Sequence, residues 1–352
     1  MELAREFSRQ GHAVSVFGRG VGGKREYVDR NGVNVIEGPG FNATGNIAID
    51  LCKDLLYALQ VAPTVPRGDI VVTNSFWLPV VLAPFKRRKG KIVVHVARFP
   101  KGQMWLYQGA DSIQAISGAV ASAVGEQCAA LKARISVVGY PVDVGLYCLP
   151  PGGRRMAQAP RILYVGRLHP EKGVHLLVDA FRRVVERAPA ARLMIVGPAA
   201  AHQGGGGEGY LRSLQTAAAG LAVEFVGAVS DDRALAQLYQ EADCFCYPSL
   251  AEKGEAFGRS VLEAMATGLP SVVSDLACFA DFLGQGEEGV VFDHRGPSPA
   301  DALAEALCSV VLDPVRAASL GEQARTRAEQ YSVERIAAAY LTLFEQVAIA
   351  RS

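Results

Sequence analysis

Long hydrophobic runs are missing from this 352-residue chain, and no apolar run approaches the roughly 20 residues that a membrane-spanning helix requires. A charge imbalance is missing as well, because 36 lysine and arginine residues stand against 35 aspartate and glutamate residues. A protein that binds nucleic acid over a large surface usually carries a clear basic excess. We therefore expect a globular protein with no nucleic-acid partner.

The seven cysteines form no recognisable set. No CxxC pair and no group of cysteines and histidines has the spacing of zinc ligands. Cys244 and Cys246 occupy alternate positions of an apolar run, which indicates one face of a strand. An odd number of cysteines in a long chain favours free thiols in a reducing compartment. Since residues 1–7 are charged and helical in pattern, unlike a signal peptide, we expect a cytoplasmic protein.

Signatures of metals and resident cofactors are also lacking. The phosphate-binding pattern GxxxxGK[ST] does not occur. The pair Asp231-Asp232 is more typical of a helix start than of a metal-binding DxD motif, and no lysine has a context suited to pyridoxal phosphate. We therefore expect no metal and no resident cofactor.

Short apolar runs alternate with longer helical patterns through most of the chain, which predicts parallel sheets with helices on both faces. Several runs are rich in valine and isoleucine without polar alternation, as expected for strands buried on both faces. The expected strands of the first half are Ala13–Phe17, Val33–Ile36, Ile70–Thr73, Lys91–Val96, Ser112–Ile116 and Ile135–Val138. Those of the second half are Arg161–Val165, Arg192–Val196, Val223–Val226, Cys244–Tyr247, Ser271–Ser274 and Gly289–Phe292.

Two domains are expected, because one hydrophobic core rarely serves so long a chain. The run from Leu149 to Arg155 is rich in proline and glycine and is the natural linker. We therefore expect doubly wound domains at residues 1–150 and 151–331. Residues 332–352 carry apolar side chains at helical spacing and are expected to form a helix that crosses back to the first domain.

The beginning of the chain differs from that of a complete doubly wound domain. A helical pattern ends at Gly11, whereas such a domain begins with a strand and a glycine-rich turn. That first strand is central in the fold, so its loss would split a sheet. We expect roughly 10–20 further residues upstream, judged from usual strand and turn lengths.

A basic run at residues 86–91 holds five lysine and arginine residues in six positions. Such a run could touch anionic lipid head groups. A solvated turn before the next strand is the alternative.

The first chemical cluster covers residues 247–270. A strand is expected to end near Tyr247, and a helix to begin near Phe257 and stop at Gly268. Ligands of parallel sheets collect beyond the carboxyl ends of strands, and a helix start offers free N–H groups to an anion. Two carboxylates, Glu255 before the helix and Glu263 within it, could therefore flank one ligand.

The second cluster covers residues 164–174, where a buried strand is expected to end at Gly166. Arg167 and Lys172 then fall in the loop and first turn of the next helix. Two cations at this position suit a diphosphate, with arginine acting as a fork and lysine as a point charge.

Together the two clusters resemble the large family of retaining glycosyltransferases with the GT-B fold, often called family 4 or group 1. The hallmarks of this family are G-R-L-x-x-x-K-G and an E-x7-E motif followed by E-A-M-A-x-G-x-P. The chain has the first at residues 166–173, and Glu255 and Glu263 followed by Ala264–Pro270 match the second. The resemblance is close over residues 160–345 and looser in the first half, through Gly11–Val14, Asp111–Ser117 and Pro141–Asp143.

The resemblance implies two Rossmann-like domains that face a central cleft, the first for the acceptor and the second for the donor. Arg167 and Lys172 would then hold the diphosphate of a nucleoside diphosphate sugar. Glu263 would hydrogen-bond the ribose hydroxyls, and Glu255 would contact the transferred sugar or steady the site beside it. Helix-start N–H groups and the turns bordering the base complete this donor site, which comprises Gly166, Arg167, Lys172, Gly197, Gly227, Phe257, Gly258, Arg259, Leu262 and Glu263.

His95 lies at the end of an expected strand in the first half. Family members carry a histidine at the corresponding strand end, across the cleft from the donor, so the resemblance implies a catalytic role for His95 beside Glu255. A hydrogen-bonded core histidine is the alternative. Arg98, Lys101 and Asn74 would contribute to the acceptor pocket.

The implied reaction transfers a sugar, from a UDP or GDP donor, to an acceptor hydroxyl with retained anomeric configuration and without a metal. A lipid carrier, a growing glycan or a small molecule could be the acceptor, with contact to the inner face of a membrane left open by the basic run. Two alternatives remain: a sugar-nucleotide epimerase of the same fold, or a nucleotide-sugar-binding protein without transfer activity.

Overall fold

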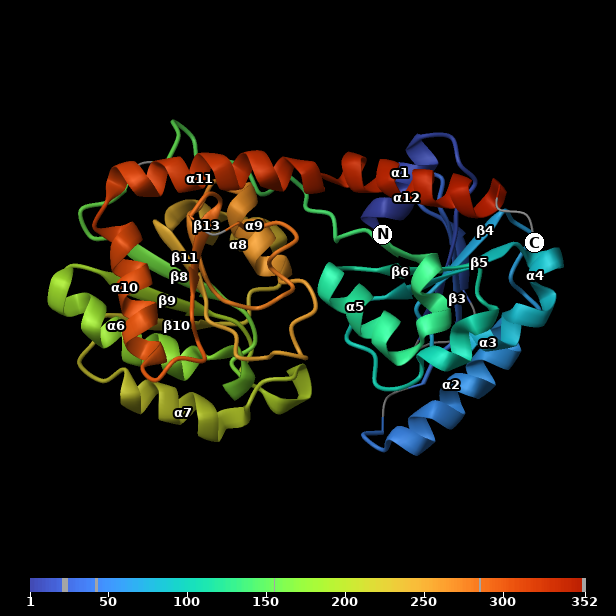
Figure 1. The fold of residues 1–352 in the computed structure, drawn as a ribbon, viewed down its shortest axis with the longest axis horizontal. Helices are drawn as coiled ribbons and strands as arrows, with labels where there is room; N and C mark the ends of the chain where they lie inside the picture. Colours follow the sequence, from blue (N-terminus) through green and yellow to red (C-terminus); the bar gives the residue numbers. More distant parts are fainter. Residues whose placement is uncertain (21–24, 42–43, 155, 285, 350–352) are drawn as a thin grey trace. The chain divides into compact units, whose positions relative to one another are not determined.

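The computed structural model describes residues 1–20, 25–41, 44–154, 156–284 and 286–349 (Figure 1). The chain divides into two compact units, Met1–Pro141 with Val333–Ser352, and Val142–Ser332. The first unit ends before the run expected as the linker, because Val142 already pairs with the end of the second unit through a 2.8 Å hydrogen bond from its amide to the Tyr331 carbonyl.

The first unit contains two sheets. One is a parallel sheet in the order β4-β5-β6-β7, and the other has the order β1-β3-β2. Among the described residues no strand ladder joins them. Their strands are β1 (Ser15–Gly20), β2 (Arg25–Val28), β3 (Asn34–Pro39), β4 (Ile70–Thr73), β5 (Lys91–Val96), β6 (Ser112–Ala115) and β7 (Ile135–Val137).

Strand β2 departs from the all-parallel expectation. It pairs antiparallel with β3, which follows it through a tight turn closed by a 3.0 Å hydrogen bond from the Gly32 amide to the Asp29 carbonyl. The strand is short, carries two charged residues and lies at a sheet edge. These properties remove the apolar signal by which the other strands could be found in the sequence.

Helices cover both sheets of the first unit. Near Val61, the helix α2 buries a cluster that receives Phe17 from β1 and Val71 from β4, so one helix packs against both sheets. Helix α1 lies beside α12 (Figure 1). Phe7 of α1 is edge to face with Tyr340 and Phe344 of α12, at centroid distances of 6.3 and 5.8 Å. The helices are α1 (Glu2–Arg9), α2 (Ile47–Val61), α3 (Leu78–Leu82), α4 (Lys86–Lys89), α5 (Gly118–Gln127) and α12 (Val333–Ile349).

The second unit contains one parallel sheet of six strands in the order β10-β9-β8-β11-β12-β13. This is the doubly wound order, in which the chain first builds outward on one side and then returns to the centre and builds on the other. Five strands have the expected bounds, and β10 extends by one residue. They are β8 (Arg161–Val165), β9 (Arg192–Val196), β10 (Val223–Gly227), β11 (Cys244–Tyr247), β12 (Ser271–Ser274) and β13 (Gly289–Phe292).

One helix of the second unit, α9, is exceptionally buried: every residue from Val261 to Ala266 is buried. Its end approaches α11 so closely that a Cβ atom added at Gly321 would lie 2.3 Å from the Gly268 carbonyl oxygen. The helices are α6 (Val174–Arg187), α7 (Gly207–Ala217), α8 (Asp232–Glu241), α9 (Arg259–Ala266), α10 (Pro299–Val311) and α11 (Pro314–Ala328). Nowhere in the described part of the chain is a helix both long and apolar enough to span a bilayer.

Candidate active site

The candidate site lies where the strand order of the second unit reverses. β8 and β11 are neighbours at the centre of the sheet. Each continues through a loop into a helix, which is α6 after β8 and α9 after β11. A reversal of this kind leaves a crevice beyond the carboxyl ends of the two strands. The two sequence clusters, at residues 164–174 and 247–270, follow these strands, so the fold brings them together.

The two loops touch through their backbones. The Leu250 amide donates to the Glu171 carbonyl at 2.8 Å. Gly173 has a left-handed φ of 66°, and a Cβ atom at this position would lie 1.9 Å from the Pro248 carbonyl oxygen. Only glycine meets both requirements, since other residues pay a steric cost at positive φ and have no room here. The glycine of the first motif is therefore needed for the approach of the second.

A buried ion pair joins the same loops. The Lys172 ammonium lies 2.6 Å from a Glu255 carboxylate oxygen, and only 6% and 10% of these side chains are exposed. The Tyr247 hydroxyl donates to the same oxygen at 2.9 Å. The ammonium also lies 5.8 Å from the centre of the Tyr247 ring, which stacks on Tyr164. The structure thus places in one cluster two residues that the sequence assigned to different parts of the donor.

Arg167 is the second cation of the first motif and is more exposed. Its guanidinium donates to a Glu171 carboxylate oxygen and to the Gly204 carbonyl, both at 2.7 Å. These contacts orient the guanidinium, and the glycine run at residues 204–207 lies beside it and leads into α7. An anion that binds Arg167 would therefore meet an arginine already held in position.

Glu263 lies on the buried helix α9 with two partners. Its carboxylate is 3.1 Å from the Arg259 guanidinium, one helical turn earlier, and accepts a 3.1 Å hydrogen bond from the Tyr239 hydroxyl on α8. Burial raises the pKa of Glu263 to about 7, although the Arg259 charge and the Tyr239 hydroxyl both lower it. The Glu263 carboxyl therefore titrates near neutral pH, and it can hydrogen-bond a polar ligand.

Most of the remaining predicted donor-site residues lie at the carboxyl ends of the strands or at the start of α9. Gly166 and Gly197 directly follow the strands β8 and β9, and Gly227 is the last residue of the neighbouring β10. The Gly197 amide lies 2.8 Å from the Gly227 carbonyl. Gly258, at a φ of 87°, begins α9 against the Phe279 ring. The side chains of Phe257 and Leu262 are buried, so the contribution of Phe257 predicted above would come from its backbone N–H group.

The predicted acceptor residues lie at one edge of the four-stranded sheet of the first unit. Asn74 follows β4, and exposed Arg98 and Lys101 follow β5, which pairs parallel with β4. His95, on β5, directs Nδ1 toward the Gln114 side-chain oxygen and lies 3.5 Å from the Tyr340 hydroxyl. Burial lowers the pKa of His95, so its imidazole is neutral at neutral pH. Its Nδ1 contacts match the hydrogen-bonded histidine considered as the alternative, and its role in catalysis stays a prediction.

Two tyrosines are the site residues that the sequence did not reveal. Tyr247 supports Glu255 and Tyr239 supports Glu263, and burial raises the pKa of both phenols well above 10, which keeps them protonated as donors. Tyr247 stands at a recognisable strand end, but nothing in the helical pattern around Tyr239 marks it. Among the described residues, no cluster of three or more histidine, cysteine or acidic side chains could hold a metal ion.

The chain is similar to proteins of known family. The family model described as Glycosyl transferases group 1 matches residues 154–327. Phosphatidyl-myo-inositol mannosyltransferase of Mycobacterium tuberculosis (strain ATCC 25618 / H37Rv) is 30% identical over 299 residues, which cover 83% of this chain and 70% of that protein.

Solved structures confirm the expected GT-B fold of two Rossmann-like domains. Sucrose-phosphate synthase from Thermosynechococcus elongatus has a TM-score of 0.79 at 21% identity and covers 99% of this chain and 92% of its own. HepE of Anabaena, solved with UDP and glucose, has a TM-score of 0.73 at 20% identity, with 98% of this chain and 94% of its own covered.

The raised pKa of Glu263 predicts a pH-dependent stability. A buried carboxyl whose pKa rises from 4.5 to about 7 favours the folded state when protonated, so its ionisation costs stability progressively as the pH rises from about 4.5 through about 7. Glu263→Gln removes this cost. We expect the variant to gain about 2 kcal/mol in unfolding free energy relative to the parent between pH 5 and pH 8. Urea unfolding at both pH values measures the difference.

The exposed Glu224 on β10 provides the matched control, because its Gln variant removes an equal charge from the same sheet. We expect no comparable gain in unfolding free energy from Glu224→Gln, because its side chain is exposed. An equal response from Glu263→Gln would show that this carboxyl titrates normally.

Proposed function

The chain belongs to the group 1 glycosyltransferases and is a hexosyltransferase, and we propose that it transfers its sugar from a nucleoside diphosphate donor to a hydroxyl of a membrane lipid head group. We further propose that the anomeric configuration is retained and that no metal takes part. The observation that carries the donor assignment is the convergence of both sequence motifs on the crevice between β8 and β11, where Lys172 meets Glu255.

In this proposal the donor lies across the carboxyl ends of β8 and β11. Arg167 and Lys172 face the diphosphate, and Glu263 accepts hydrogen bonds from the ribose hydroxyls. The start of α9 adds N–H groups and the positive end of the helix dipole. HepE is named in complex with UDP, which supports a UDP-sugar as the donor. A GDP-sugar is the second candidate.

The chemistry required of the site is stabilisation of the diphosphate as it leaves and the sugar becomes cationic. Two preorganised cations and the helix-start N–H groups suffice for this, because they act where charge develops and need not reorganise. Glu255 is poorly suited to attack the sugar itself, since both Lys172 and Tyr247 engage one of its oxygens. We therefore propose front-face attack by the acceptor hydroxyl, without a covalent intermediate.

The first unit would hold the acceptor. His95 offers a neutral imidazole at the edge where Asn74, Arg98 and Lys101 gather, and we propose that it orients the attacking hydroxyl or receives its proton. The burial that lowers the pKa of His95 keeps the ring able to accept a hydrogen bond at neutral pH.

A lipid acceptor is favoured by an exposed apolar stripe on α2. Ile49, Leu56 and Leu59 share one side of this helix at helical spacing, and each is between 46% and 60% exposed. An apolar helix face with basic residues nearby is typical of proteins that lie on a membrane surface. A lipid acceptor would also agree with the phosphatidyl-myo-inositol named for the relative.

Residues 86–89 of the basic run form helix α4 rather than a solvated turn. Lys89 of α4 donates to the Pro63 carbonyl at 2.9 Å, which places the run at the end of α2. Lys86 and Lys91 pair with Asp111, so they are committed to the fold. Arg87 and Arg88 are exposed and have no ion-pair or hydrogen-bond partner among the described residues, which makes these two the candidates for lipid contact.

Donor binding predicts thermal stabilisation by one nucleoside diphosphate. A ligand at one hundred times its Kd adds about 2.7 kcal/mol to the unfolding free energy. We expect UDP or GDP to stabilise the parent but neither Arg167→Ala nor Glu263→Ala, while Arg161→Ala, with its exposed side chain at the opposite end of β8, responds like the parent. Differential scanning fluorimetry measures all four proteins.

Stabilisation of none of the four by UDP, GDP or ADP would contradict the donor assignment. Transfer is checked by incubating the protein with the stabilising nucleotide's sugar and a lipid extract. A glycosylated lipid supports the proposal, whereas an epimerised donor supports the epimerase alternative and an unchanged donor supports a binding protein without activity.

Membrane contact predicts a dependence on anionic lipid. Each basic residue near an anionic surface contributes about 1 kcal/mol, so Arg87→Gln with Arg88→Gln should weaken binding roughly thirtyfold. Flotation with phosphatidylcholine vesicles, with and without phosphatidylglycerol, measures it. The control is Val315→Ser, which removes an exposed apolar side chain from the second unit. Equal flotation of the double variant and the parent would exclude this surface.

A further inference from the structure

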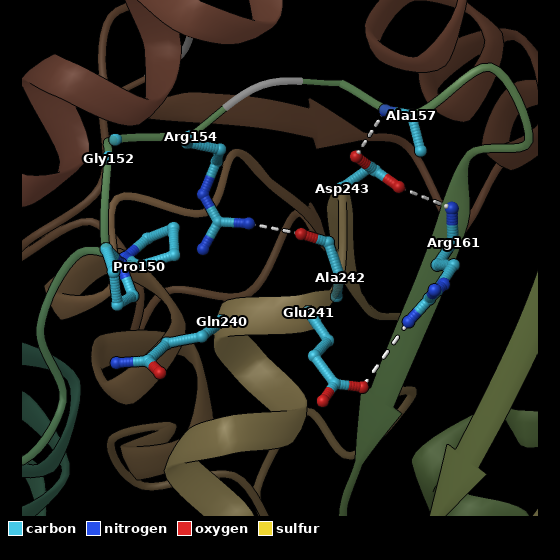
Figure 2. Close-up of a pocket in the computed structure, with 11 residues that line it drawn as sticks. Pro150, Gly152, Arg154, Ala157, Arg161, Gln240, Glu241, Ala242 and Asp243 are labelled. Atoms are coloured by element: carbon cyan, nitrogen blue, oxygen red, sulfur yellow. Dashed lines mark hydrogen bonds and ion pairs between the residues drawn. The ribbon is translucent and has the colours of Figure 1, made fainter.

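Arg154, in the proline- and glycine-rich run before β8, binds the ends of two helices of the second unit. Its side chain borders a cavity of 460 Å³ at the amino end of β8, opposite the end that carries the candidate site (Figure 2). The guanidinium turns inward to the end of α8, where Nη1 donates to the Ala242 carbonyl (Figure 2). Burial lowers the pKa of Arg154 to about 10, which leaves it charged at neutral pH.

The same guanidinium joins two helix ends. Nη2 donates to the Tyr239 carbonyl at 3.1 Å and to the Thr267 carbonyl at 3.0 Å. Tyr239 lies in the last turn of α8, Ala242 follows the last residue of α8, and Thr267 follows the last residue of α9. The last carbonyls of a helix lack partners within it and form the negative end of its dipole, so a cation there is favourable. The planar Arg154 guanidinium thus links the ends of α8 and α9 and holds them at a set separation.

A second arginine also binds the end of α9. Arg325 of α11 donates to the Ala266 carbonyl, and the same group donates to the Tyr147 carbonyl at 2.9 Å. The C-terminal end of α9 is therefore tied both to α8 and to the segment that follows Pro141. Since the helix has only eight residues, constraints on its end act close to every side chain it carries.

Both helices that Arg154 joins contribute to the Glu263 site. Tyr239 gives its carbonyl to Arg154 and its hydroxyl to Glu263. The Glu263 carbonyl accepts from the Thr267 amide at 3.2 Å, so Glu263 is one turn from the other carbonyl that Arg154 holds. The contact between Tyr239 and Glu263 spans the two helices, and its length depends on their separation.

We propose that Arg154 is a positioning residue for donor binding. Arg154 sets the separation of α8 and α9, and this separation sets the orientation of the Glu263 carboxylate toward the donor ribose. The proposal rests on the donor site proposed above. Arg154 forms no hydrogen bond with Glu263, Arg167 or Lys172, and it acts on the site only through Tyr239 and α9.

The test compares Arg154→Met with Arg161→Met, an exposed arginine that lines the same cavity and pairs with Glu241. Calorimetric titration with UDP and GDP gives Kd, and steady-state kinetics give KM and kcat, at a temperature where circular dichroism shows every variant folded. For Arg154→Met we expect Kd and the donor KM to rise about tenfold with kcat little changed, as for the loss of a hydrogen bond to a charged group. Arg161→Met should match the parent.

Arg154→Lys keeps the positive charge but loses the planar guanidinium that binds several carbonyls at once. We expect a smaller rise in Kd for this variant than for Arg154→Met. This variant also serves if Arg154→Met does not fold. A merely structural role would lower the melting temperature of either variant without moving Kd, and that result would overturn the proposal.

A double-mutant cycle with Glu263→Gln shows whether Arg154 acts through the carboxylate. We expect Arg154→Met to add little to Kd once Glu263 is replaced, because neighbours that act through one contact are not additive. Full additivity would overturn the proposal while leaving the donor site in place. Failure of the parent to bind either nucleotide would instead overturn the donor site, and this proposal with it.

Discussion

The buried ion pair between Lys172 and Glu255 is the interaction on which the rest of the site depends. Each partner comes from the loop after a different central strand, so the pair fixes how the two loops meet. Two charges this far from water are tolerated only as a pair, because removal of one leaves the other uncompensated. The close backbone approach at Gly173 and the Tyr247 hydroxyl then complete a cluster that neither loop could form alone.

The two acidic residues of the second motif differ in how their charge is compensated. Glu255 faces a buried ammonium, whereas the Arg259 side chain that faces Glu263 is 59% exposed and shares its charge with solvent. Burial therefore prevails at Glu263 and raises its pKa to about 7. Glu255 is thus held in a buried ion pair, whereas Glu263 has a raised pKa and can hydrogen-bond a ligand. Strongly perturbed pKa values of this kind are typical of functional sites.

Sequence patterns predicted the second unit well and the first unit less well, for physical reasons. The central strands of the six-stranded sheet are buried on both faces, and their apolar runs mark their bounds almost exactly. Strand β2 was missed because an edge strand needs no apolar run, and α4 because four consecutive basic residues carry no apolar periodicity. The contacts of Tyr239 and Arg154 arise between segments far apart in the chain, so no local pattern could reveal them.

The most direct test of the central claim is a double-mutant cycle of Lys172→Met and Glu255→Gln, read by urea unfolding and by nucleoside diphosphate binding. The account predicts that each single variant loses about 3 kcal/mol of unfolding free energy, that the double variant loses far less than the sum, and that none of the three binds nucleotide like the parent. Additive losses of stability together with unchanged binding would show that the pair neither joins the two loops nor forms part of the donor site.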